Sequence, residues 1–201
     1  MKLARRWLLA LALSLALPAT AASGPAPATA ADRALGRPDA PVTVIEYASV
    51  TCPHCAAWHE EVFPAFKAAL IDTGRVRYVY REFVTAPGQL SFAGALLARC
   101  APPERFFDVV GSLMAGQGAL AASGDANAWL RAGAAAGGLD GPAASACLRD
   151  EAGVAELEAR LDAASAAGVR SSPSFFINGA PFQGWSAADF EAAVARTRAA
   201  D

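Results

Sequence analysis

The sequence predicts a protein of the α/β class, in which a helical subdomain is inserted into a core of strands and helices. Two observations predict this class. Segments rich in β-branched and aromatic residues lie at 42–47, 75–83 and 174–177, and this composition is typical of strands. Between the second and third of them, residues 87–168 are rich in alanine and leucine and are divided by glycine, proline and aspartate, as in a series of short helices.

The first 21 residues have the organisation of a secretory signal peptide. Lys2, Arg5 and Arg6 precede the apolar run 8–17, and a proline and small residues follow that run. The run is too short to cross a bilayer as a helix. The sequence therefore predicts a cleavable signal peptide over 1–21, with a single uncleaved anchor as the alternative.

The composition and net charge exclude one class of function. The chain has 201 residues, 54% of them hydrophobic, and a net charge of −2. Removal of residues 1–21, which contain three basic and no acidic side chains, leaves a net charge of about −5. This charge excludes a nucleic-acid-binding protein that relies on phosphate neutralisation. No later segment is long and apolar enough to predict a membrane span.

The first part of the folded core is expected over 36–86. The preceding residues, 22–35, are mostly alanine, proline, serine, glycine and threonine without a pattern, and this composition predicts a disordered lead-in. A strand over 42–47 leads through a short loop into a helix, in which Pro64 should cause a kink. A second strand follows over 75–83. The apolar face of the helix repeats every four residues, at Trp58, Val62, Phe66 and Leu70.

The helical insert is expected over 87–168 and the second part of the core over 169–201. A hairpin over 174–183, with an Asn-Gly turn, and a last helix over 187–198 complete the core. Five helices are predicted in the insert, at 90–99, 104–114, 126–136, 142–149 and 151–167.

The sequence C-P-H-C opens the first predicted helix. Proline is favoured at the first helical position, so Pro53 places Cys52 at the N-cap. The Cys52 sulfur then faces unpaired N–H groups and the positive end of the helix dipole, and both lower its pKa. His54 adds a ring N–H or a positive charge in the same direction. Cys55, one turn further on, is expected to be more buried and to attack a mixed disulfide formed on Cys52.

Redox chemistry is the reading that this context favours. Each unit by which the pKa of Cys52 lies below ambient pH stabilises the reduced form by about 1.4 kcal/mol, or about 30 mV toward an oxidant. A structural bridge or a zinc site remains open, because Cys52, His54, Cys55 and His59 are all possible ligands. Since Ala56 follows Cys55, the haem-attachment pattern C-x-x-C-H is absent. We expect an oxidant with no metal and no cofactor.

The chain resembles the thioredoxin-fold DsbA family of thiol:disulfide oxidoreductases. The C-P-H-C motif at 52–55 matches the family in all four positions, and the loop G-V-R-S-S-P-S-F-F at 168–176 is similar to its cis-proline loop. The resemblance covers nearly the whole chain after the signal peptide. It implies a thioredoxin fold with an inserted helical subdomain.

The resemblance also implies roles for three further residues. Pro173 should be cis after Ser172, and the Ser172 backbone should bind an extended substrate. Glu46, six residues before the first cysteine, should be a buried acid that relays a proton from Cys55. The alternatives are a trans proline at a strand start and an exposed glutamate at a strand end. Serine replaces the commoner threonine or valine before the proline, which bears on the redox potential and not on the class.

Cys100 and Cys147 lie in predicted helices of the insert. A subset of relatives has an extra cysteine pair in this region, which implies a structural disulfide between these two residues. Closure of such a loop would stabilise the fold by about 4 kcal/mol. Two buried free thiols are the alternative.

The resemblance implies a periplasmic oxidant that donates its Cys52–Cys55 disulfide to unfolded or reduced exported proteins. The resemblance also implies reoxidation by a DsbB-like membrane quinone reductase, and we expect a monomer. The alternatives are a reductase or isomerase of the same fold, and a non-enzymatic peptide- or metal-binding module. Residues 22–40 are too short for the dimerisation domain of the dimeric isomerases. Cytochrome-maturation reductases usually have tryptophan before the first cysteine, where this chain has Thr51.

Overall fold

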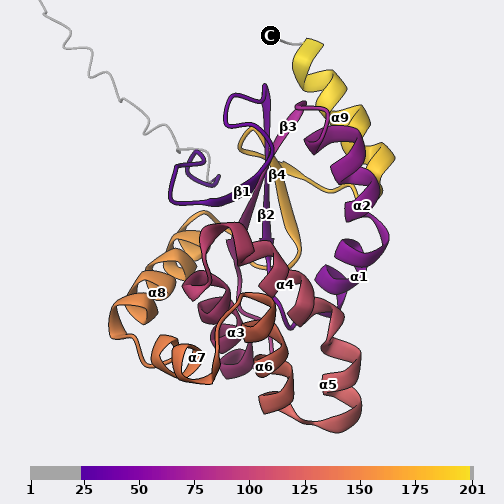
Figure 1. Ribbon diagram of the computed structural model, residues 1–201. Coiled ribbons are helices and arrows are strands. Elements are labelled where there is room, and N and C mark those ends of the chain that lie inside the picture. Colours follow the sequence, from indigo (N-terminus) through magenta and orange to yellow (C-terminus); the bar gives the residue numbers. More distant parts are fainter. Residues whose placement is uncertain (1–23, 200–201) are drawn as a thin grey trace, which may run out of the picture.

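The computed structural model describes residues 24–199 (Figure 1). The predicted signal peptide over 1–21 lies outside the described residues. Between residues 24 and 199, no helix combines the length and the apolar character that a membrane crossing requires.

A five-stranded mixed sheet in the order β1-β3-β2-β4-β5 forms the centre of the core. The central strand, β2, is parallel to its neighbour β3, and the other neighbouring pairs are antiparallel. β2 is almost completely buried, because helices cover one face of the sheet at this position, and Ala164 and the segment around Ala28 pack against the other. The strands are β1 (Arg33–Leu35), β2 (Val42–Ala48), β3 (Val76–Glu82), β4 (Ser174–Ile177) and β5 (Ala180–Phe182).

Strand β1 corrects the prediction of a disordered lead-in over 22–35. Residues 33–35 pair with β3 at the edge of the sheet. Arg81 fixes the segment before them, since its guanidinium donates to the carboxylate of Asp32 at 3.0 Å and to the carbonyl oxygen of Ala26 at 2.9 Å. Composition alone missed this order because the partners come from β3, far along the chain.

The helix after β2 is interrupted near its predicted kink. Helix α1 (Pro53–Glu61) ends before Val62, α2 (Phe63–Phe66) follows, and a π-helical turn spans Lys67–Ile71. Pro64 has no N–H, and its ring excludes the carbonyl of residue 60, which accounts for the interruption. Helix α9 (Ala187–Ala199) packs beside α2 on the same face of the sheet (Figure 1).

The segment between β3 and β4 is helical, as predicted. Figure 1 shows its helices gathered at the end of the sheet where α1 begins. Helix α5 was not predicted, because its sequence, Q-G-A-L-A-A-S, has no apolar periodicity. The helices are α3 (Gly88–Cys100), α4 (Phe106–Ala115), α5 (Gln117–Ser123), α6 (Ala126–Ala136), α7 (Gly141–Cys147) and α8 (Glu151–Ala166).

A disulfide joins α3 to α7. The sulfurs of Cys100 and Cys147 are bonded, and their Cα atoms lie 6.0 Å apart. The bond links two helices that are 47 residues apart in sequence.

Trp58 fixes α1 against the sheet. Its side chain is fully buried, and its ring packs on those of Phe66, Phe175 and Phe190, with centroid distances of 5.6, 4.8 and 5.7 Å. Its indole N–H donates to the carbonyl oxygen of Trp185 at 3.1 Å. These contacts join α1, β4 and α9, so they set the position of the dithiol at the start of α1.

Candidate active site

Cys52 is the N-cap of α1, as the sequence predicts. Its backbone is extended, with φ −84° and ψ 116°, and Pro53 begins the helix. The backbone N–H of Cys55 donates to the Cys52 sulfur at 3.2 Å. Both cysteines are free thiols in this structure. The Cys52 sulfur therefore occupies the capping position that a serine or aspartate oxygen takes in many helices.

The hydrogen bonds around Cys52 lower its pKa from the ordinary value of 9.0 to about 6. The bond from the Cys55 thiol has the largest effect, and partial burial opposes it. The backbone N–H groups of Cys55 and His54 and the side chain of Ser172 lower the pKa further. The ring of His54 is exposed, so the effect of this residue comes through its backbone and not through the predicted ring charge.

Cys55 has the opposite character. Its side chain is fully buried, and burial is the main reason why its pKa is raised. The hydrogen bond to Cys52 and the negative charge of Glu46 raise the pKa further. The Ser172 hydroxyl oxygen lies 2.9 Å from the Cys55 sulfur. The two thiols are therefore differentiated, one favouring the thiolate and the other the protonated form.

The loop before β4 meets the dithiol. The Ser172–Pro173 peptide bond is cis, and the Ser172 carbonyl accepts a hydrogen bond from the Cys52 thiol at 3.3 Å. Ser172 lies 120 residues from Cys52 in sequence, and the pairing of β4 with β2 brings the two together. The structure thus brings together the cysteines and the serine-proline pair that the sequence selected.

Glu46 is buried beneath this site on β2. Its side chain has no exposed surface, because β2 is covered on both faces. The Tyr78 hydroxyl donates to Oε2 of Glu46, and Nε2 of His59 lies 2.9 Å from the same oxygen. The second carboxylate oxygen, Oε1, is buried and has no hydrogen-bond partner among the described residues. Glu46 thus has one carboxylate oxygen available to a proton in the interior.

The comparisons with known proteins agree with this geometry. The family model described as Thioredoxin matches residues 28–196. The crystal structure of Wolbachia pipientis alpha-DsbA1 superposes with a TM-score of 0.74 at 26% identity, covering 84% of this chain and 92% of that one. This chain belongs to the DsbA-like group of the thioredoxin family. The predicted thioredoxin fold with an inserted helical subdomain is confirmed.

Two further relatives of this DsbA-like chain are informative. A Rickettsia typhi protein, named as a candidate protein-disulfide oxidoreductase, is 34% identical over 167 residues, which are 82% of this chain and 61% of that protein. The structure of a protein-disulfide isomerase from Novosphingobium aromaticivorans has a TM-score of 0.66 and 28% identity, covering 83% and 97% of the two chains. The chain spans about 60% of the length of the curated relatives that it matches first.

A hydroxyl cluster in this DsbA-like protein was missed by sequence reasoning. The Ser49 hydroxyl lies 2.7 Å from that of Ser91 and 3.1 Å from that of Thr51, and Thr85 bonds to both Ser49 and Thr51. The cluster fixes the loop before Cys52 to the start of α3. Its members come from two short stretches of the chain, 49–51 and 85–91, which meet only in the folded protein, so no local pattern could have revealed it.

Gln117 was missed for a similar reason. Its side-chain amide donates to the carbonyl oxygens of Val50 at 2.8 Å and Cys52 at 3.2 Å. It thereby connects the inserted helices to the active-site loop of this DsbA-like protein. Gln117 begins α5, the helix that the sequence did not predict.

The position of His59 in the sequence could have indicated that it belongs to the site. It lies four residues after Cys55, so it shares the inner face of α1 with that cysteine. The sequence suggested it only as a possible zinc ligand, whereas the structure places it against Glu46. Among residues 24–199, no three histidine, cysteine or carboxylate side chains are grouped so that they could hold a metal ion.

Proposed function

We propose that this protein is a thiol:disulfide oxidoreductase that acts as an oxidant of exported proteins. The observation that carries the proposal is the difference between its two thiols, a Cys52 with a pKa of about 6 beside a buried Cys55 with a raised pKa. The name of the Rickettsia relative and the similarity to Wolbachia alpha-DsbA1 support the same class of reaction.

The reaction begins from the Cys52–Cys55 disulfide. A substrate thiolate attacks the Cys52 sulfur, a mixed disulfide forms, and the bond between Cys52 and Cys55 breaks. Cys55 leaves with the electron pair and takes up a proton, as its raised pKa favours. A second substrate thiolate then attacks the substrate sulfur of the mixed disulfide. The substrate leaves with its own disulfide, and Cys52 leaves as a thiolate.

Three residues support these steps. The cis peptide bond before Pro173 presents the Ser172 backbone beside the Cys52 sulfur, where it can bind an extended substrate chain. Glu46 supplies or removes the proton of Cys55; its Oε1 has no hydrogen-bond partner in the described structure, and its charge acts on the Cys55 thiol. General acid–base groups of this kind contribute about 10²–10⁴-fold to a rate.

The low pKa of Cys52 sets the direction of transfer. At pH 7 it lies about one unit below ambient, which stabilises the reduced form by about 1.4 kcal/mol. This free energy corresponds to about 30 mV toward a more oxidising couple. The Cys52–Cys55 disulfide closes a loop of only four residues, so loop-closure entropy stabilises this bond only a little. Both effects favour donation of the disulfide.

The compartment and partners belong to the same proposal. The signal-peptide pattern over 1–21 supports export to the periplasm, where a protein disulfide can persist. Reduced exported chains are the substrates, and a DsbB-like membrane quinone reductase reoxidises the dithiol. The protein acts as a monomer.

The test is to measure the reduction potential of the dithiol and the oxidative refolding of a reduced, unfolded substrate protein. We expect a potential more oxidising than about −200 mV, in the range of oxidants and isomerases of this kind, and refolding that is lost in Cys52→Ser. A strongly reducing potential without refolding activity would contradict the oxidant direction. Retention of activity in Cys52→Ser would contradict the site. Faster repair of scrambled disulfides than of reduced chains would favour an isomerase, the function named for the Novosphingobium relative.

A further inference from the structure

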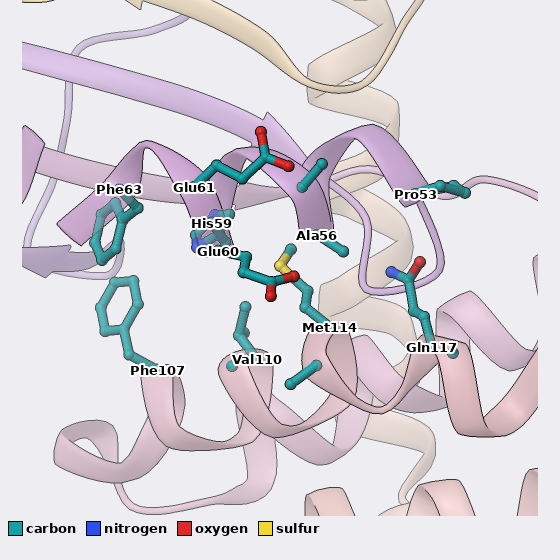
Figure 2. A pocket seen from close by; sticks show the side chains of 14 residues that line it. Pro53, Ala56, His59, Glu60, Glu61, Phe63, Phe107, Val110, Met114 and Gln117 are labelled. Atoms are coloured by element: carbon teal, nitrogen blue, oxygen red, sulfur yellow. The ribbon is translucent and has the colours of Figure 1, made fainter. Parts of the chain in front are cut away.

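A groove of about 640 Å³ lies between α1 and α4, beside the dithiol. Figure 2 shows the rings of Phe63 and Phe107 facing each other at one end, and Pro53 and Gln117 at the other. Met114 and other apolar side chains of α4 form one wall. This volume lies within the range of pockets that bury small molecules or peptide side chains.

Small residues keep the groove open. Ala56 and Ala57 face it from α1, and Gly111 and Ala115 face it from α4. A Cβ atom added at Gly111 would meet no heavy atom within 4 Å. A larger side chain at position 111 would therefore occupy free space and not displace the protein's own atoms.

The groove has negatively charged side chains in its lining. Glu60 and Glu61 are exposed carboxylates in its lining, and no lysine or arginine lines it. Among the described residues, neither glutamate takes part in an ion pair or a side-chain hydrogen bond. The third ionisable side chain of the lining, His59, already contacts Glu46. An apolar groove with free carboxylates complements an occupant that is both apolar and cationic.

The groove borders the residues that hold Cys52 in place. Pro53, the residue after Cys52, lines it, and Gln117, which also lines it, donates to the Cys52 carbonyl at 3.2 Å. From Pro53 at the start of α1 to Phe63 at the start of α2 the chain advances by about 15 Å, at about 1.5 Å per residue. About five residues of extended chain cover that length. A chain whose cysteine reacts at Cys52 can therefore place its next few residues in the groove.

We propose that this groove selects substrates, and that it binds extended segments in which a bulky apolar residue and a lysine or arginine lie within about five residues of the reacting cysteine. The apolar side chain packs against Met114 and Phe107, and the cation lies at Glu60 and Glu61. This inference rests on the proposed thiol–disulfide exchange and names the class of polypeptide that enters it.

The test uses oxidised full-length mature protein and synthetic single-cysteine peptides, with stopped-flow measurement of mixed-disulfide formation. One peptide has phenylalanine and lysine on either side of the cysteine, a second has phenylalanine and glutamate, and a third has serine and lysine. We expect the phenylalanine–lysine peptide to react about five-fold faster than either of the others, as two exposed ion pairs and one apolar contact allow. The preference over the glutamate peptide should shrink as salt is added.

Two variants remove the proposed determinants separately. Glu60→Gln/Glu61→Gln should reduce the preference for lysine over glutamate to less than about two-fold. Gly111→Leu fills the groove, and should remove the preference for phenylalanine over serine. Each peptide rate is divided by the rate of the same variant with dithiothreitol, which does not need the groove. Glu158→Gln removes a charge and Ala155→Leu adds a leucine side chain at exposed positions of α8, and both variants should leave the two preferences intact.

The outcomes separate the two proposals. Equal rates for all three peptides, with a normal dithiothreitol reaction, would overturn groove selection and leave the exchange function standing. Failure to react with dithiothreitol and with every peptide would overturn the proposed function itself. A wild-type dimer that Gly111→Leu converts to a monomer would show that a second copy occupies the groove, which also overturns the inference. If Gly111→Leu does not fold, as judged by circular dichroism, the preference for lysine over glutamate in Glu60→Gln/Glu61→Gln alone tests the proposal.

Discussion

The hydroxyl oxygen of Ser172 lies 2.9 Å from the sulfur of Cys55, although 117 residues separate the two in sequence. The carbonyl oxygen of the same serine accepts a hydrogen bond from Cys52 at 3.3 Å. The residue before the cis-proline therefore contacts both sulfurs. Its side chain lowers the pKa of both thiols, so it acts on the dithiol from outside the C-P-H-C motif.

Replacement of this hydroxyl should raise the pKa of Cys52. A single hydrogen bond contributes about 0.5–1.5 kcal/mol, which corresponds to a shift of up to about one pKa unit. We expect Ser172→Ala to move the Cys52 titration upward from about 6, as followed by thiolate absorbance at 240 nm in the reduced protein. Ser171→Ala is the matched control, because the Ser171 hydroxyl pairs with Ser174 and contacts neither sulfur. An unchanged titration in Ser172→Ala would contradict the contact.

The low pKa of Cys52 also predicts how the stability of the reduced protein depends on pH. The pKa is about 6 in the folded chain against an ordinary 9.0, so the folded state holds the thiolate where the unfolded state is still protonated. The stabilisation is complete above about pH 9 and is lost as the pH falls through 6. It amounts to about 1.4 kcal/mol at pH 7. Cys55 has a raised pKa and removes stability only above pH 9.

The measurement is the free energy of unfolding of the reduced and the oxidised protein between pH 5.5 and 8. Groups other than the two thiols contribute nearly equally to both forms, so the difference isolates the dithiol. We expect this difference to change by about 2.5 kcal/mol in favour of the reduced form across that interval. Cys52→Ala/Cys55→Ala should follow the pH dependence of the oxidised form. A constant difference would show that the Cys52 pKa is not lowered.

Much of the fold followed from local patterns. Valine and tyrosine in β2 and β3, and the alanine-rich helices between β3 and β4, are recognisable because each pattern is contained within one element. The edge strand β1 was missed because its partner strand, β3, lies about 45 residues further along the chain. Helix α5 was missed because tertiary contacts, and not apolar periodicity, stabilise a short helix of this composition.

The residues of the candidate active site also differ in whether the sequence could predict them. Cys52 and Pro53 could be assigned from the chemistry of a helix N-terminus, and Ser172 and Glu46 from resemblance to a family. Gln117 and the hydroxyl cluster around Ser49 could not be predicted, since each consists of single polar residues that meet only after folding. Such residues carry no spacing signal.

The charge of Glu46 offers a separate test of the buried site. That charge raises the pKa of Cys55, after the larger effects of burial and of the hydrogen bond to Cys52. Glu46→Gln preserves the shape of the side chain and removes the charge, so we expect the pKa of Cys55 to fall. Carbon-13 labelling of the cysteine Cβ atoms reports this titration.

Kinetics distinguish the proton relay from a purely electrostatic effect of Glu46. If Glu46 accepts the proton of Cys55, the attack of Cys55 on a mixed disulfide held by Cys52 should slow by about 10²-fold in Glu46→Gln. Glu158→Gln, which removes a charge from an exposed position of α8, should leave both the pKa of Cys55 and this rate unchanged. A lowered Cys55 pKa without a slower attack would leave Glu46 as a charge only.

The Cys100–Cys147 disulfide should stabilise the protein without affecting the dithiol. It closes a loop between residues separated by 47 positions, and the chain-entropy model gives about 4 kcal/mol for a loop of this length. We expect Cys100→Ala/Cys147→Ala to lower the free energy of unfolding of the oxidised protein by about that amount. The pKa of Cys52 should stay near 6, because the hydrogen-bond partners of its sulfur lie on α1 and in the cis-proline loop. A shifted Cys52 titration in a folded variant would instead show that the α3–α7 bond is coupled to the active site.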